Sequence, residues 1–317
     1  MNIKQLFTEM SENYLISRSD LSENTLYGLK YVIKYFIDSI GDDKEDITED
    51  DYLAWSKSLG VVDNTKCNYQ KIIRQFIIYI NSHGYRFIIL DVIKTKDDYV
   101  PYYFSEEEYL EIINSVDNYC YTNHRSQCED YCLPMLTRIL ISTGSRVNEI
   151  CSLKIDDYDR EKGVLHIKNT KKRKERLIPL HPSLIIILNR YIDVLREIEP
   201  KSIYMFPLKD HTKHMNSHHI DNTFKIIFRN LGYKRPNKRF QRGICPHCFR
   251  HNFAINSFKQ SLEQGYDIVN VIPFLSIYLG HARLSETEKY LKFSSDLFPD
   301  NIQQFENYMN DVFKEDS

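Results

Sequence analysis

The sequence has no run of about 18 apolar residues, which is the length that a helix needs to cross a membrane. Its first residues, MNIKQLFTEMSENY, also lack the apolar core of a signal peptide, so the sequence predicts a cytoplasmic protein without a membrane segment. The net charge is only −2 over 317 residues, because 42 basic side chains face 44 acidic ones. The chain is therefore not a uniformly basic nucleic-acid binder, and any anion-binding surface must be a local patch.

Cysteine is scarce, and its arrangement excludes the common cysteine-based frameworks. Seven cysteines in a chain without a secretion signal favour thiols over a disulfide network. Cys245 and Cys248 form a CxxC, but no second CxxC exists and the spacings fit no standard zinc finger. The sequence therefore predicts no metal and no other cofactor. Zinc is kept as an alternative, with the second pair of ligands drawn from His211, His214, His218 and His219.

Apolar periodicity predicts a helical N-terminal domain over residues 1–95. Apolar residues recur at helical spacing from Leu26 to Ile37, with Ser22 before them and Gly41 where a C-cap glycine belongs. Similar patterns predict helices over 3–16, from Thr48 to near Gly60, and from Asp63 or Asn64 to near Gly84. Residues 96–103 are polar and contain a proline, so they predict a linker.

Residues 104–317 predict a second domain of mixed α/β structure. Five helical patterns surround the one clear β region, in which VLHIKN and RLIPL alternate on either side of the turn KKRKE. Pro273 should kink or start the helix that ends in LGH, and Gly280 can take the left-handed conformation that ends helices. A final amphipathic helix, with apolar residues from Ile302 to Phe313, forms a C-terminal tail. The predicted fold class is mainly α with a small antiparallel sheet.

Five short motifs in this second domain carry groups suited to phosphodiester chemistry. Arginine binds phosphate oxygens through paired donors, histidine moves protons near neutral pH, and tyrosine can act as a covalent nucleophile. The motifs are Arg146 in STGSRVNEICSL, Lys171 in KNTKKRKERLIPL, the helical pair His247 and Arg250, His281 after LG, and Tyr290 nine residues later.

Taken in that order, these motifs resemble the tyrosine recombinases, also called the phage integrase family. The resemblance covers residues 104–295 well and the N-terminal part loosely, and PFLSIYLGH is more similar to transposon-type integrases. It implies a helical core-binding domain that clamps DNA together with the catalytic domain. It also implies a site-specific recombinase that cuts and rejoins DNA through a 3′-phosphotyrosyl intermediate, for integration, excision or transposition of a mobile element, with no metal.

The resemblance assigns a role to each motif residue. Arg146 and Arg250 would hold the non-bridging oxygens, and Glu149 would brace Arg146. His247 would accept the phenol proton of Tyr290, which would attack the phosphorus, while His281 would donate a hydrogen bond to the phosphate. Lys171 would protonate the departing 5′-oxygen, and Lys172 is the competitor if the turn is one residue longer. Tyr278 and Tyr308 are the alternative nucleophiles.

Basic residues outside the motifs predict the contacts to double-stranded DNA. Thr25, Tyr27, Lys30 and Lys34 lie on one helix of the N-terminal domain, and Lys66, Gln70, Lys71 and Arg74 form the polar face of another. Five positive charges lie between residues 234 and 242 without an acid. The predicted DNA-binding residues are Lys30, Lys66, Lys71, Arg74, Lys172, Lys174, Lys234, Arg235, Lys238, Arg239 and Arg242.

Two other functions fit the same sequence. One is a relaxase of the type IB topoisomerase kind, which would share the catalytic set without needing a specific site. The other is a non-catalytic DNA-binding regulator that keeps the fold. The family resemblance favours the recombinase, and it also implies a homotetramer on DNA assembled through the C-terminal tail, with accessory DNA-bending proteins as further partners.

Overall fold

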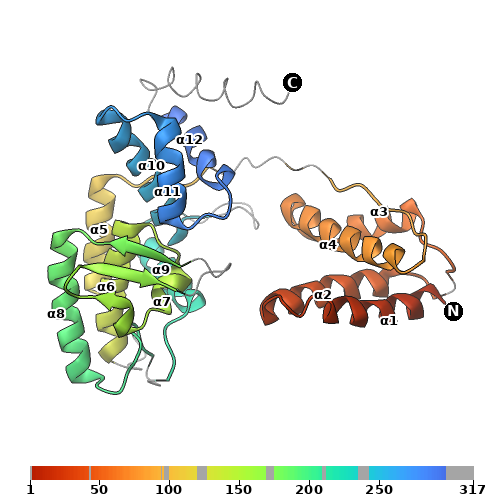
Figure 1. Cartoon of the computed structure of the whole chain (residues 1–317), viewed down its shortest axis with the longest axis horizontal. Helices are drawn as coiled ribbons and strands as arrows, with labels where there is room; N and C mark the ends of the chain where they lie inside the picture. The colour runs from red at the N-terminus through yellow and green to blue at the C-terminus, as the bar shows by residue number, and fades with distance from the viewer. Residues whose placement is uncertain are drawn as a thin grey trace. The chain divides into compact units, whose positions relative to one another are not determined.

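A computed structural model describes residues 2–42, 44–93, 95, 100–119, 127–168, 175–208, 212–234 and 243–297 (Figure 1). The chain divides into two compact units, one running to Asp98 and the other beginning at Tyr99. Helices dominate both units, and the named strands of the described residues form one small antiparallel sheet. The predicted fold class is confirmed. Residues 96–99 of the expected linker 96–103 lie outside the described residues.

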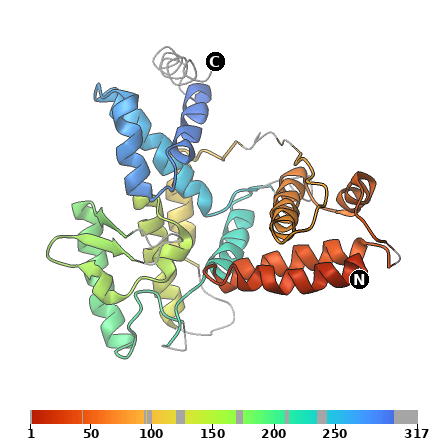
Figure 2. The same cartoon turned by 45° about the vertical axis from the view of Figure 1, so that its right-hand side comes forward.

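The first unit holds four described helices, where the apolar periodicity predicts them. Ser22 caps α2 by accepting from the backbone N–H of Thr25, and Thr48 forms a capping box with Asp51 at the start of α3. Helix α2 ends without the expected left-handed glycine, because Ile40 leaves it in an extended conformation. Figure 2 shows α1 and α2 side by side. The helices are α1 Ile3–Ile16, α2 Glu23–Ser39, α3 Glu49–Ser58 and α4 Asp63–Ser82.

Gln70 lies in the interior of this first unit, not on the polar face of α4 as expected. Its amide nitrogen donates to Ser56 Oγ at 3.0 Å, and its amide oxygen accepts from the backbone N–H of Ile93 at 2.9 Å. A buried amide needs such partners, since an unpaired one would cost about 1–3 kcal/mol. Gln70 therefore holds the segment after α4 and does not face solvent.

The second unit packs its helices around α6, with the sheet beside them. Helix α6 contacts α5, α8 and α10, and α10 also contacts α11 and α12. The strands β1 Tyr158–Asp159, β2 Val164–Ile167 and β3 Arg176–Pro179 are antiparallel in the order β1-β2-β3. The helices are α5 Glu106–Asp117, α6 Gln127–Thr143, α7 Val147–Cys151, α8 Pro182–Ile198, α9 Ser217–Asn230, α10 His247–Glu263, α11 Ile268–Leu279 and α12 Ser285–Leu297, with a 3-10 turn at Ile155–Asp157.

One of the two alternatives expected for Pro273, that it starts its helix, is wrong. Pro273 lies inside α11, which starts five residues earlier at Ile268 with Asp267 as its N-cap. Pro273 lacks the backbone N–H of one helical hydrogen bond, while its neighbours Ile272 and Leu275 are buried and hold the helix by apolar packing. Helix α7 and strand β1 were not expected, because five and two residues are too few to show a periodicity. The expected tail helix lies outside the described residues.

Glycine is required where α6 turns toward α7. Gly144 has φ +59°, and a Cβ added there would lie 2.6 Å from Cδ1 of Phe253 on α10. Gly265, after α10, also has a positive φ, +80°, but a Cβ there would meet nothing within 4 Å. A side chain at Gly144 would therefore strain the left-handed backbone and also clash with Phe253, whereas a side chain at Gly265 would only strain the backbone.

We predict that Gly144→Ala destabilises the protein more than Gly265→Ala. The substitution at Gly265 should cost about 1 kcal/mol for the left-handed backbone, and Gly144→Ala should cost about 1–3 kcal/mol beyond that for overpacking against Phe253. Denaturant unfolding of both variants measures the difference. Equal losses would show that Phe253 moves aside without cost.

Candidate active site

Arg250 is the most deeply buried charge of the candidate site. It lies one turn into α10, after His247, and is only 2% exposed. Its Nη1 donates to the Gly144 carbonyl at 2.9 Å and its Nη2 to the Leu279 carbonyl at 2.8 Å. Burial lowers the pKa of Arg250 to about 10, and the charge of Arg146 acts in the same direction. The guanidinium is still protonated at neutral pH.

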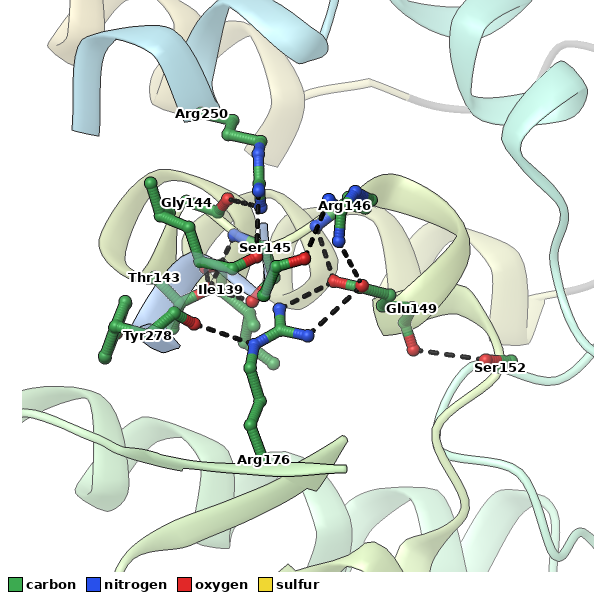
Figure 3. A network of polar contacts seen from close by, with 12 residues as sticks. Ile139, Thr143, Gly144, Ser145, Arg146, Glu149, Ser152, Arg176, Arg250 and Tyr278 are labelled. Atoms are coloured by element: carbon green, nitrogen blue, oxygen red, sulfur yellow. Dashed lines mark hydrogen bonds and ion pairs between the residues drawn. The ribbon is translucent and has the colours of Figure 1, made fainter. Parts of the chain in front are cut away.

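Arg146 stands at the N-cap of α7, where the left-handed Gly144 redirects the chain after α6. Its Nη1 donates to Glu149 Oε1 at 2.9 Å and its Nη2 to the Gly280 carbonyl at 3.0 Å (Figure 3). The side chain is still 35% exposed, so it remains open to a ligand. The predicted bracing of Arg146 by Glu149 is therefore present.

Arg176 is a third arginine of the site, and the sequence analysis did not single it out. It opens β3, yet its side chain is buried and its Nη2 donates to Glu149 Oε2 at 2.7 Å. Its Nε donates to the Tyr278 carbonyl at 2.7 Å. The alternation of the strand could have predicted its burial, because Arg176 lies on the same face as the buried Ile178 while Leu177 is exposed.

The three arginines meet at the C-terminal end of α11. Arg176, Arg250 and Arg146 donate to three successive carbonyls, those of Tyr278, Leu279 and Gly280 respectively. These carbonyls lie at the end of a helix, where carbonyl groups lack intrahelical partners and the helix dipole is negative. The end of α11 therefore gathers three positive charges beside His281.

His281 follows the left-handed Gly280, which has φ +66°, and is 8% exposed. Its Nδ1 lies 2.6 Å from Thr287 Oγ1, and its ring stacks on that of Tyr290 with centroids 6.0 Å apart. Burial lowers the pKa of His281 to about 3, reinforced by the charges of Arg250, Arg146 and Arg176. The imidazole is therefore neutral at pH 7 and can donate through Nε2 when Nδ1 accepts from Thr287.

Tyr290 lies on α12 and is 5% exposed, within the cluster that α10, α11 and α12 form. Burial raises the pKa of its phenol. The charge of Arg250 and a hydrogen bond from it act in the opposite direction, as does the charge of Arg146. The phenol is thus protonated at rest, and its ionised form would be stabilised by the same arginines.

His251 joins two of the predicted residues and was missed by the sequence analysis. Its ring lies 4.6 Å from the ring of His247 and 5.4 Å from that of Tyr290, measured between centroids. It stands one helical turn after His247, and this i, i+4 spacing was the signal that could have found it. The structure thus brings together Arg146, His247, Arg250, His281 and Tyr290, whereas Lys171 and its competitor Lys172 lie outside the described residues.

The zinc alternative does not fit the positions of the two cysteines. Cys248 is fully buried in the main hydrophobic core of the second unit, beside Phe249, and Cys245 is half-buried. Among the described residues, no group of three or more histidine, cysteine, aspartate or glutamate side chains could hold a metal ion. Of the suggested histidines, His211 lies outside the described residues.

The predicted DNA-binding residues fall into three groups. Lys30, Lys71 and Lys234 are exposed. Lys66 lies 3.9 Å from Asp63, and Arg74 donates to the Leu90 carbonyl at 2.6 Å, so both also have partners within the protein. Lys172, Lys174, Arg235, Lys238, Arg239 and Arg242 lie outside the described residues. In the described part of the chain no helix is long and apolar enough to cross a membrane.

Comparisons with known proteins confirm the family resemblance. The model of the phage integrase family matches residues 103–295. A tyrosine recombinase of Thermosipho africanus (strain TCF52B) is 27% identical over 301 residues, which cover 89% of this chain and 93% of the relative.

Two solved structures show the same fold over almost the whole chain. XerH recombinase bound to a palindromic difH substrate has a TM-score of 0.69 at 19% identity, covering 93% of this chain and 84% of its own. The Tn1549 transposon integrase in complex with a circular intermediate DNA has a TM-score of 0.66 at 17% identity, covering 92% and 94%. With the family model matching more than half of its residues, the chain belongs to the phage integrase family of tyrosine recombinases.

Proposed function

We propose that this protein is a site-specific DNA recombinase that cuts and rejoins DNA through a covalent bond between Tyr290 and a 3′-phosphate. The observation that carries the proposal is the setting of Tyr290. Its phenol stacks on a neutral His281, accepts a hydrogen bond from Arg250 and lies within reach of the charge of Arg146. Such a setting favours a phenolate and the negative phosphoryl group that it attacks.

The arginines supply charge stabilisation in this proposal. Attack on a phosphodiester adds negative charge to the phosphoryl oxygens, and donors fixed in advance stabilise that charge without reorganising. Arg250 is fixed by two carbonyls, and Arg146 by Glu149 and the Gly280 carbonyl. Both would direct their remaining N–H groups at the two non-bridging oxygens.

The histidines and a lysine handle protons and hydrogen bonds. His247 would accept the proton of Tyr290, with His251 between them as the ring that contacts both. His281 would donate to the phosphate from Nε2 while Nδ1 is held by Thr287. Lys171 would protonate the departing 5′-oxygen, and Lys172 is its competitor. The scheme requires no metal or other cofactor.

The first unit would bind the duplex as a core-binding domain over residues 1–95, closing on DNA together with the catalytic domain over 104–317. Helix α2 exposes Tyr27 and Tyr31 beside Lys30, a mixture of aromatic and basic groups suited to contacts with sugar and phosphate. Lys71 on α4 and Lys234 after α9 add positive charge. Because DNA is the substrate, the cytoplasmic location is part of this proposal.

The biological reaction is proposed to be integration, excision or transposition of a mobile element. The structural likeness to a transposon integrase supports this class of element. A homotetramer on DNA, linked by the C-terminal tail, is part of the proposal. Helix α11 exposes Phe274 and Ile277, at 75% and 70%, as apolar surface that an exchanged tail could cover. Accessory DNA-bending proteins are further candidate partners.

Tyr290→Phe should abolish covalent adducts while leaving DNA affinity within about 2-fold of the original, because only the phenol oxygen is removed. Nicked duplexes from DNA that flanks the gene are incubated with the protein, and adducts are resolved on a denaturing gel. Tyr278→Phe is the matched control. It should keep forming adducts, because the site uses only the backbone carbonyl of Tyr278. Adducts that survive Tyr290→Phe would place the nucleophile elsewhere, and bound DNA without any adduct would favour a regulator.

His281 should make folding stability depend on pH. Its pKa of about 3 in the folded protein lies below the usual 6.5, so between these values the unfolded chain binds a proton that the folded protein does not. The free energy of unfolding should therefore fall as pH drops below 6.5. The fall is at most about 1.4 kcal/mol per pH unit, and solvent screening makes it smaller. Denaturant unfolding at several pH values should give a shallower fall for His281→Gln. Parallel curves would contradict a buried neutral imidazole.

Lys71→Ala should weaken binding to all DNA sequences alike and lower the slope of log affinity against log salt by about 1, as expected for one lost phosphate contact. Lys162→Ala is the control, since Lys162 is exposed in the second unit and pairs with Asp159. Fluorescence anisotropy across a salt series measures both variants. An unchanged slope for Lys71→Ala would remove α4 from the DNA interface.

A further inference from the structure

Arg176 joins the sheet to the catalytic arginines through a buried ion pair. Its Nη1 and Nη2 donate to the two oxygens of Glu149, at 3.2 and 2.7 Å (Figure 3). Glu149 also accepts from the Arg146 side chain at 2.9 Å and from the Arg146 backbone N–H at 3.0 Å. The carboxylate of Glu149 is therefore shared between Arg146, which is partly exposed, and Arg176, which is buried.

Among the described residues of this cluster, the charges match those of the proposed ligand when Arg176 is present. Arg146, Arg176 and Arg250 carry three positive charges and Glu149 one negative charge, which leaves two positive charges in excess. A phosphodiester attacked by a phenolate carries two negative charges. Without Arg176 the excess falls to one, and Glu149 would hold Arg146 as its counter-ion, in competition with the phosphate.

Arg176 also fixes the turn that carries His281. Its Nε donates to the Tyr278 carbonyl, and its guanidinium packs on Gly280 so closely that a Cβ there would lie 2.8 Å from Nη1. Gly280 in turn gives its carbonyl to Arg146. The same side chain thus orients both the acceptor that braces Arg146 and the backbone before His281.

We propose that Arg176 is a positioning residue for DNA cleavage, which balances the charge of Glu149 so that the charge of Arg146 stays available to the phosphate and its side chain stays oriented toward it. The inference rests on the proposed function. Arg176 touches neither substrate nor reacting atoms in this scheme, and it acts through Glu149 and the end of α11. Its loss should therefore lower the cleavage rate at saturating DNA and leave DNA affinity nearly unchanged.

A double-mutant cycle separates this charge balance from a merely structural role. Arg176→Met should slow adduct formation on saturating nicked DNA by about 100-fold, because Glu149 would then draw Arg146 away from the phosphate and weaken a charge-stabilising donor. Glu149→Gln should slow the wild-type reaction, yet it should speed the Arg176→Met reaction by about 10-fold, because the double variant regains two excess positive charges. Arg176→Lys, which keeps the charge and loses the paired donors, should fall between wild type and Arg176→Met.

The matched control is Arg160→Met. Arg160 forms a bidentate pair with Asp193 in the same unit, at 2.6 and 2.7 Å, but this pair is exposed. Its rate should stay within about 2-fold of wild type. A wild-type rate for Arg176→Met would overturn the proposal. So would an Arg176→Met defect that Glu149→Gln fails to relieve or makes worse, because that outcome identifies a structural ion pair.

Titration of His281 by NMR is a second measurement, and it needs no DNA. It tests the role of Arg176 separately from the proposed recombinase function. The charge of Arg176 is among those that lower the pKa of His281. In an NMR titration this pKa should therefore rise in Arg176→Met, which loses the charge. It should rise less in Arg176→Lys, which keeps it. Unchanged titration in both variants would overturn the proposal even if Arg176→Met unfolds too readily for kinetics. Wild-type protein that forms no Tyr290-dependent adduct would reject the proposed function, whatever the titration shows.

Discussion

Three guanidinium groups converge on the last turn of α11, and the geometry of the site depends on that convergence. Each arginine comes from a different element, namely the start of α7, the start of β3 and the first turn of α10. Each donates to its own carbonyl at the helix end, so the elements are held in register by hydrogen bonds as well as by apolar packing. The polar end of a helix, which is otherwise a cost to bury, here organises the surrounding chain.

Placing like charges so close together is tolerable only with compensation. Glu149 offsets part of the repulsion. Burial raises the pKa of this carboxyl, but its interactions with Arg176 and Arg146 outweigh burial and leave the pKa below its usual value. The carbonyls that accept from the arginines and the dipole of α11 supply further negative potential. Because the full chain carries a net charge of −2, this cationic site contrasts with the rest of the molecule and does not share a general basic character.

The sequence predicted the parts of the fold that depend on local patterns. Long amphipathic helices, the hairpin of β2 and β3, and Gly280 as a helix end follow from periodicity and backbone preference, and the family resemblance identified the residues that meet at the site. The buried positions of Arg176 and Gln70 were missed, because their hydrogen-bond partners are distant in the chain. Arg176 was expected only as the first residue of a strand after the basic turn, and its buried partner Glu149 lies 27 residues away. Gln70 looked like a surface residue for the same reason.

The depth of Tyr290 has a consequence for what happens after a strand is cut. An ester formed at a side chain that is 5% exposed would have little contact with bulk water, so hydrolysis would compete poorly with a hydroxyl delivered by a DNA end. The broken strand would then stay attached to Tyr290 until a new partner strand arrived. Enclosure of Tyr290 would thus favour rejoining of the cut strand over its permanent loss, as a consequence of how the side chain is packed.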